Sequence, residues 1–87
     1  MTNLAQIEAR MDQYESAVID LYEGIRDAAA VVDLIIADDD MPRRKSRRLQ
    51  IVRRTTQRSK ESIALFERAL ANLEAERRRY LAGEVDG

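Results

Sequence analysis

The chain has 87 residues and contains neither cysteine nor histidine. Their absence excludes disulfides and thiolate metal sites and removes the commonest side chains of acid–base and nucleophilic catalysis. The net charge of −1 conceals an asymmetry. Residues 1–40 carry ten acidic and two basic side chains, a net charge of −8, whereas residues 43–82 carry thirteen basic and four acidic ones, a net charge of +9.

Composition predicts one small all-α domain spanning residues 1–87. Helix-forming residues dominate, and there are only three glycines and one proline. The first residues lack the basic and apolar regions of a secretory signal. The longest apolar-rich run, residues 25–37, is too short to span a bilayer and carries three charged residues. We therefore expect a cytoplasmic protein without a membrane segment.

The first predicted helix covers about residues 3–38. Asn3 is a good N-cap, and Gln6 stands three residues later as in a capping box. Apolar residues alternate in steps of three and four, the spacing of a coiled-coil seam. The seam of this helix consists of Leu4, Ile7, Met11, Tyr14, Val18, Leu21, Ile25, Ala28, Val32 and Ile35.

A turn is predicted at residues 39–42 and a second helix at about 43–82. Asp40 is the expected cap of this helix, and Pro42 suits its first turn, where a missing N–H costs little. Gly83 is the expected residue after the helix, and residues 83–87 are expected to form a frayed tail. The second helix has a poorer seam: Leu49, Val52, Thr56, Ser59, Ile63, Phe66, Leu70, Leu73, Arg77 and Tyr80.

The two seams fit one another when the chain folds back at the turn. Ile35 then faces Leu49 and Leu4 faces Tyr80, and the residue numbers of every facing pair add to 84. The sequence therefore predicts an antiparallel two-helix coiled-coil hairpin. Two helices cannot enclose an apolar stripe, so we expect a second copy or a partner to complete a helical bundle.

Some seam layers are predicted to be weak. Ala28 faces Thr56 and Ile25 faces Ser59, which makes the middle of the seam small and polar on one side. Ile7 faces Arg77, whose aliphatic stem can cover it while the guanidinium stays in water.

The residues flanking the seam form two edges. The small-residue edge pairs Arg10 with Glu76, Ala17 with Ala69, Gly24 with Ser62, Val31 with Thr55 and Asp38 with Arg48. The charged edge pairs Glu8 with Glu74, Glu15 with Glu67, Tyr22 with Lys60 and Ala29 with Arg53, with Ile36 near the turn.

The small residues suit close packing of another helix, although Gly24 can equally be a tolerated glycine. The outer pairs of the small-residue edge can form salt bridges. A second hairpin laid antiparallel on the charged edge brings its acidic end over the basic end, which favours a homodimeric four-helix bundle.

Several side chains are candidates for partner binding. Val31, Leu34, Ile36 and Ile51 are apolar but lie off the seam near the turn. They indicate a contact patch, although single exposed aliphatics are also normal on protein surfaces. The full candidate set is Ala17, Tyr22, Gly24, Val31, Leu34, Ile36 and Ile51.

No catalytic or cofactor motif is present, so we expect a protein that is not an enzyme and needs no cofactor. Facing carboxylates such as Glu8 and Glu74 lack an accompanying histidine, and residues 38–40 lack the spacing of a calcium loop. A solvated acidic face is the simpler interpretation of these carboxylates, and no metal is expected.

A basic run begins the second helix. Nine of the eighteen residues from 43 to 60 are basic, with no acidic residue among them: Arg43, Arg44, Lys45, Arg47, Arg48, Arg53, Arg54, Arg58 and Lys60. They can neutralise the acidic first helix or a dimer mate, bind an acidic protein, or contact the phosphates of a nucleic acid. The acidic helix beside them favours neutralisation.

In size and layout the chain resembles two groups of small helical proteins. One is the two-helix co-chaperones of type III secretion, which often open in the style of Met1-Thr2-Asn3-Leu4 and turn near a proline such as Pro42. The other is the small accessory proteins of bacteriophages. The arginine-rich run departs from the co-chaperones, and no family or residue role is carried over.

We expect a non-enzymatic interaction module of the assembly adaptor, co-chaperone or partner-binding inhibitor type, which binds itself or another protein. The alternative is a small nucleic-acid-binding or regulatory protein.

Overall fold

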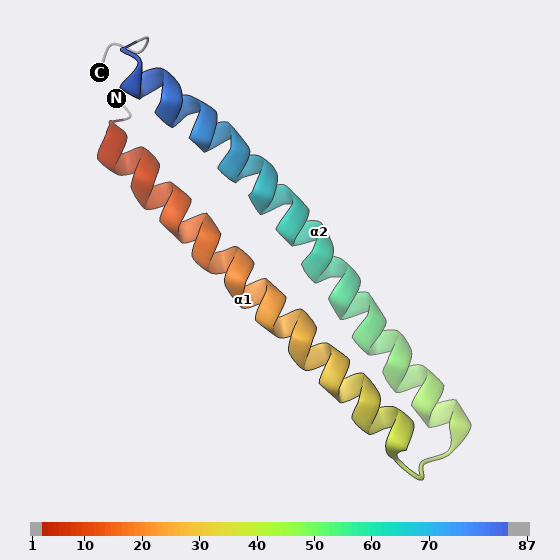
Figure 1. Cartoon of the computed structure of the whole chain (residues 1–87). Coiled ribbons are helices and arrows are strands. Elements are labelled where there is room, and N and C mark those ends of the chain that lie inside the picture. Colours follow the sequence, from red (N-terminus) through yellow and green to blue (C-terminus); the bar gives the residue numbers. More distant parts are fainter. Residues whose placement is uncertain (1–2, 84–87) are drawn as a thin grey trace.

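The computed structural model describes residues 3–83, which form two long antiparallel helices (Figure 1). Helix α1 spans Leu4–Ala37 and helix α2 spans Pro42–Leu81. The hairpin measures 64 × 17 × 14 Å, with a radius of gyration of 19.3 Å. A compact chain of this length would have a radius of gyration of about 12 Å. The predicted all-α hairpin is confirmed, and residues 3–83 form a single layer of two helices.

The helix ends lie within one residue of the predicted positions. Asn3 caps α1 as expected: its side chain accepts a hydrogen bond from the N–H of Gln6, and the Gln6 side chain accepts one from the N–H of Asn3. Gly83 follows α2 with a φ of +77°, a conformation that favours glycine. The remainder of the predicted tail, residues 84–87, lies outside the described residues.

The predicted cap of α2 was wrong by one residue. Met41 occupies the N-cap position and makes no side-chain cap, and Pro42 begins the helix. The Asp40 carboxylate instead accepts a hydrogen bond from the Met41 N–H, at 2.8 Å, and lies 3.9 Å from the guanidinium groups of Arg44 and Arg48. Asp40 therefore acts just before the helix, where a negative charge still suits the dipole of α2.

The heptad register is visible in the burial of the side chains. All twenty seam residues of the two helices are buried or half-buried. Few other side chains are shielded to this degree, so the seam forms nearly the whole interface between α1 and α2. The ring centroids of Tyr14 and Phe66, which occupy adjacent layers, are 5.5 Å apart.

The buried side chains lie near the two ends of the hairpin and, on α2, at Ile63 near its middle. At the open end, Ile7, Met11 and Leu73 form a buried cluster. Ile35 is buried next to the turn. Between Met11 and Ile35, α1 has no fully buried side chain, which agrees with the small and polar layers predicted there.

Candidate interaction surfaces

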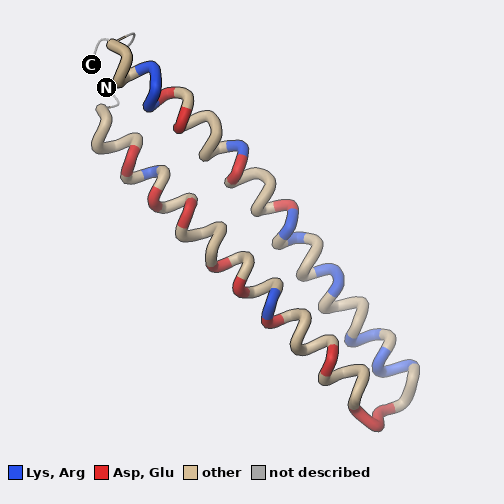
Figure 2. Tube along the Cα trace, in the orientation of Figure 1, with Lys and Arg blue, Asp and Glu red and all other residues tan. Residues whose placement is uncertain are grey.

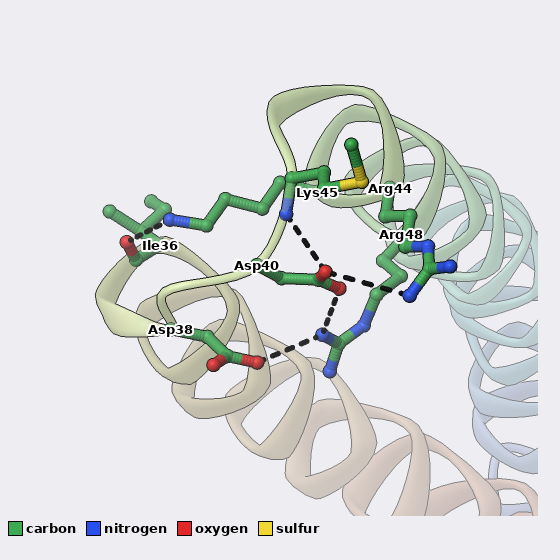
Figure 3. Close-up of polar contacts among 7 residues, drawn as sticks. Ile36, Asp38, Asp40, Arg44, Lys45 and Arg48 are labelled. Atoms are coloured by element: carbon green, nitrogen blue, oxygen red, sulfur yellow. Dashed lines mark hydrogen bonds and ion pairs between the residues drawn. The ribbon is translucent and has the colours of Figure 1, made fainter.

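The turn is held by a network of charged side chains, of which Asp40 and Lys45 are half-buried (Figure 3). Arg48 contacts the carboxylate of Asp38 at 3.3 Å and that of Asp40 at 3.9 Å. The Lys45 ammonium donates to the Ile36 carbonyl at 3.2 Å, so a positive charge lies at the C-terminal end of α1. The basic start of α2 is thereby tied to the acidic end of α1.

The small-residue edge is open along its middle. Ala17, Ser62 and Ala69 are half-buried, whereas Gly24, Val31 and Thr55 are exposed. A Cβ added to Gly24 would meet no heavy atom within 4 Å, so no part of this chain requires a glycine there. At the ends of this edge, Asp38 pairs with Arg48 as expected. Arg10 and Glu76, both described, form no ion pair.

The polar contacts on the charged edge differ from the facing pairs that the sequence predicted. The hydroxyl of Tyr22 donates to Glu67 at 3.2 Å, one heptad beyond the Lys60 that the register placed opposite it. This hydrogen bond, together with the negative charge of Glu67, raises the pKa of Tyr22 above its ordinary value of 10.0. Glu74 lies 3.7 Å from Arg77 and 3.6 Å from Arg78 on the same helix.

Large apolar side chains remain exposed on both edges. Of the predicted candidates, Tyr22, Val31, Leu34, Ile36 and Ile51 are all exposed, and Leu34 retains 71% of its surface. Sequence reasoning did not single out four further exposed side chains: Ile19, Met41, Leu65 and Leu81. Their apolar character outside the seam was the available signal. Ile19 and Tyr22 line a shallow hollow with Glu23, Ile25 and Arg26.

The basic run contributes little direct neutralisation of α1. Figure 2 shows its positive charges gathered on the part of α2 nearest the turn. Within residues 3–83, only Arg44 and Arg48 of this run form ion pairs with acidic side chains, and both acids belong to the turn. The remaining members with no acidic partner in that part of the chain are Arg43, Lys45, Arg47, Arg53, Arg54, Arg58 and Lys60. Lys45 is bound to the Ile36 carbonyl, and the charges of the other six are available to another molecule.

Neither helix, as far as the described residues extend, has a stretch that is both long and apolar enough to cross a membrane. Over the same residues, no three acidic side chains come close enough together to hold a metal ion.

Comparisons with protein-family models, with curated proteins and with solved structures find no match for this chain.

Proposed function

We propose that this chain is a non-enzymatic protein–protein interaction module, of the assembly adaptor, co-chaperone or partner-binding inhibitor type. It self-associates or binds a partner through the faces of its two helices. One observation carries the proposal: the seam is fully used inside the hairpin, yet many large apolar side chains are still exposed. These are Ile19, Tyr22, Val31, Leu34, Ile36, Met41, Ile51, Leu65 and Leu81.

The exposed surface supports this proposal. The chain has an accessible surface of 6968 Å² for a mass of 10.0 kDa. A compact monomer of that mass exposes about 5,200 Å², so the hairpin has a surplus of about 1,700 Å². A standard protein–protein interface buries a total of about 1,600 Å². Each partner contributes about 800 Å² of that total, so the surplus on this chain is about twice the area that one standard interface would cover on it.

The small-residue edge suits a helical partner. Leu34 and Ile51 lie at nearly the same level of the hairpin, because the register pairs their neighbours Ile35 and Leu49. Val31 lies beside them, and Gly24 leaves open space further along this edge. Small residues between larger apolar ones allow a second helix to approach closely while its side chains contact Leu34 and Ile51.

Affinity capture with matched variants tests the proposal. A Leu34→Asp/Ile51→Asp double variant places two charges beside the small-residue edge. An Ala30→Asp/Ala75→Asp variant makes the same charge change at exposed positions on the outer faces of the helices. Mass spectrometry of proteins captured from the native host should identify a partner retained by the wild type and by the control but lost from the first variant. Equal capture by all three, together with a monomeric wild type, would contradict the proposal.

Nucleic-acid binding is the second candidate function. Arg43, Arg47, Arg54 and Arg58 recur on the outward side of α2, are exposed, and have no acidic partner within the described residues. Such a stripe can contact several phosphates. An electrophoretic shift with DNA or RNA at moderate salt should be lost in Arg54→Glu/Arg58→Glu. It should persist in Arg10→Glu/Arg26→Glu, which changes the net charge equally on α1. Equal loss in both variants, or no shift by the wild type, would count against this function.

A further inference from the structure

Along the charged edge of α2, basic residues come first and acidic residues follow. An identical helix running in the opposite direction therefore presents the opposite charge at each position. Arg53, Lys60, Glu67 and Glu74 follow one another at intervals of seven residues. Residues seven apart lie on the same side of a helix. Two bases are followed by two acids, so a second copy running in the opposite direction places an acid opposite each base.

We propose that the charged edge is a self-association surface that joins two antiparallel copies of this chain about a two-fold axis. This inference rests on the proposed interaction function and names a second copy as the occupant of this edge. Arg53 then faces the partner's Glu74, and Lys60 faces the partner's Glu67. Both pairs require the same register, in which the axis passes at the level between Ile63 and Ala64. Because the contact is two-fold, four such ion pairs form.

The two-fold axis located from the ion pairs of α2 crosses α1 between two exposed apolar side chains. The seam pairs Ile63 with Leu21, so the axis crosses α1 at the level of residues 20 and 21. These residues lie between Ile19 and Tyr22, which are 58% and 53% exposed. Each Ile19 therefore faces the partner's Tyr22, and two apolar contacts close the centre of the interface. The same register sets Arg26 against the partner's Glu15.

The ends of the charged edge agree with this register. Ile36 lies near the turn and Leu81 at the open end, and they are 60% and 61% exposed. The two-fold axis brings Ile36 to about the level of the partner's Leu81. An exposed apolar residue at each end of the edge and an apolar pair at its centre supply the area that favours association.

A parallel arrangement of the two copies is disfavoured by charge. It would place Glu8 and Glu15 beside the partner's Glu67 and Glu74, which gathers eight carboxylates at one end of the bundle. The antiparallel arrangement separates these eight carboxylates, four at each end of the bundle, and the like-charged contact that remains is Glu8 at the level of the partner's Asp33. Exposed ion pairs individually contribute little stability, so the charges set orientation and register while the apolar contacts supply affinity.

The existing contacts of these residues leave room for the proposed pairs. Glu67 accepts one hydrogen bond from Tyr22, and Glu74 lies beside Arg77 and Arg78. A carboxylate has about four acceptor sites, so both can accept a further donor. Arg53 and Lys60 have no acidic partner in the part of the chain that the structure describes.

Charge reversal tests the register. Arg53→Glu/Lys60→Glu makes the edge of α2 entirely acidic, and Glu67→Lys/Glu74→Lys makes it entirely basic. Light scattering of the wild type at micromolar concentration should give twice the mass of the 10.0 kDa chain. Each double variant should dissociate with a Kd at least about tenfold higher, whereas the variant with all four substitutions should associate like the wild type. Arg54→Glu/Arg58→Glu, with the same charge change on the outward side, should remain dimeric.

The possible outcomes separate this inference from the proposed function. A wild-type dimer that both double variants leave intact would overturn the charged-edge register and leave an interaction module that uses another face. A monomeric wild type would overturn self-association, and the partner-capture experiment would then decide the function independently. Circular dichroism of each variant should show an unchanged helical signal, so that loss of association is not loss of the hairpin.

Discussion

At the scale of single residues, the most shielded side chain lies in a layer that the sequence marked as weak. Ile7 faces Arg77 in the register, and it is only 1% exposed. Arg77 is half-buried with its guanidinium 3.7 Å from Glu74, which fits an aliphatic stem over the core and a charged end in water. Ile7, Met11 and Leu73 therefore anchor the open end of the hairpin.

The burial of Ile7 predicts a large effect of truncation. Ile7→Ala should lower the free energy of unfolding by about 2–4 kcal/mol, because it removes buried methyl groups and leaves a cavity. Leu34→Ala removes a similar volume from a largely exposed side chain and should change stability by less than about 0.5 kcal/mol. Urea unfolding at one fixed protein concentration measures both variants. Equal effects of the two substitutions would show that the open end is not the core.

The hydrogen bond between Tyr22 and Glu67 predicts a measurable titration. It raises the pKa of Tyr22, so this contact stabilises the folded chain below the ordinary tyrosine pKa and the stabilisation is lost as the pH rises through the raised value. The difference in tyrosinate absorbance between the wild type and Tyr22→Phe reports the ionisation of Tyr22. This difference should appear above pH 10. Glu67→Gln, which removes the negative charge, should move it to lower pH. No change in Glu67→Gln would mean that the contact is absent in solution.

Individual polar partners were the least predictable feature of this molecule. Asp40 was expected to cap α2, but its carboxylate reaches the N–H of the next residue and two arginines instead. Tyr22 was expected opposite Lys60, but its hydroxyl reaches Glu67. Several donors and acceptors lie within reach of each exposed side chain, and their interaction energies differ by less than about 1 kcal/mol. A sequence pattern does not resolve such differences.

At the scale of the helices, the heptad spacing determined the fold. All twenty seam positions are shielded because a repeat of three and four residues keeps one stripe of each helix facing the other. The antiparallel register could be predicted because the seam residues of both helices face one another along the whole hairpin when the numbers of each pair add to 84. The helix ends could be predicted to within one residue from Asn3, Pro42 and Gly83, whose backbone preferences are strong.

Two glycines provide a matched test of the helices. Gly24→Ala should stabilise the free chain by up to about 1 kcal/mol, because it reduces backbone entropy inside α1 and meets no neighbour. Gly83→Ala should destabilise it by about 1 kcal/mol, because φ at this position is +77°. Thermal unfolding of both variants at the same concentration measures the difference. Destabilisation by Gly24→Ala would show that another helix already packs against the small-residue edge.

At the scale of the whole molecule, the hairpin is a single layer with apolar and charged groups left over on both edges. The sequence predicted most of these groups, including Tyr22, Leu34 and Ile51. It missed Ile19, Met41, Leu65 and Leu81, because pairing the residues of one seam does not identify which apolar residues outside the seam stay exposed. The occupant of each edge depends on a second molecule, which the internal periodicity of one chain does not specify.

The order of charges along α2 is the exception. It specifies a second copy as the partner of the charged edge, because an antiparallel copy places an acidic residue opposite each basic one. The most direct test mixes the two charge-reversed chains, Arg53→Glu/Lys60→Glu and Glu67→Lys/Glu74→Lys. Sedimentation velocity should show that each alone is monomeric and that an equimolar mixture forms a heterodimer, because every like-charged contact becomes an opposite-charged one. A mixture that sediments as the sum of two monomers would contradict the antiparallel charged-edge dimer.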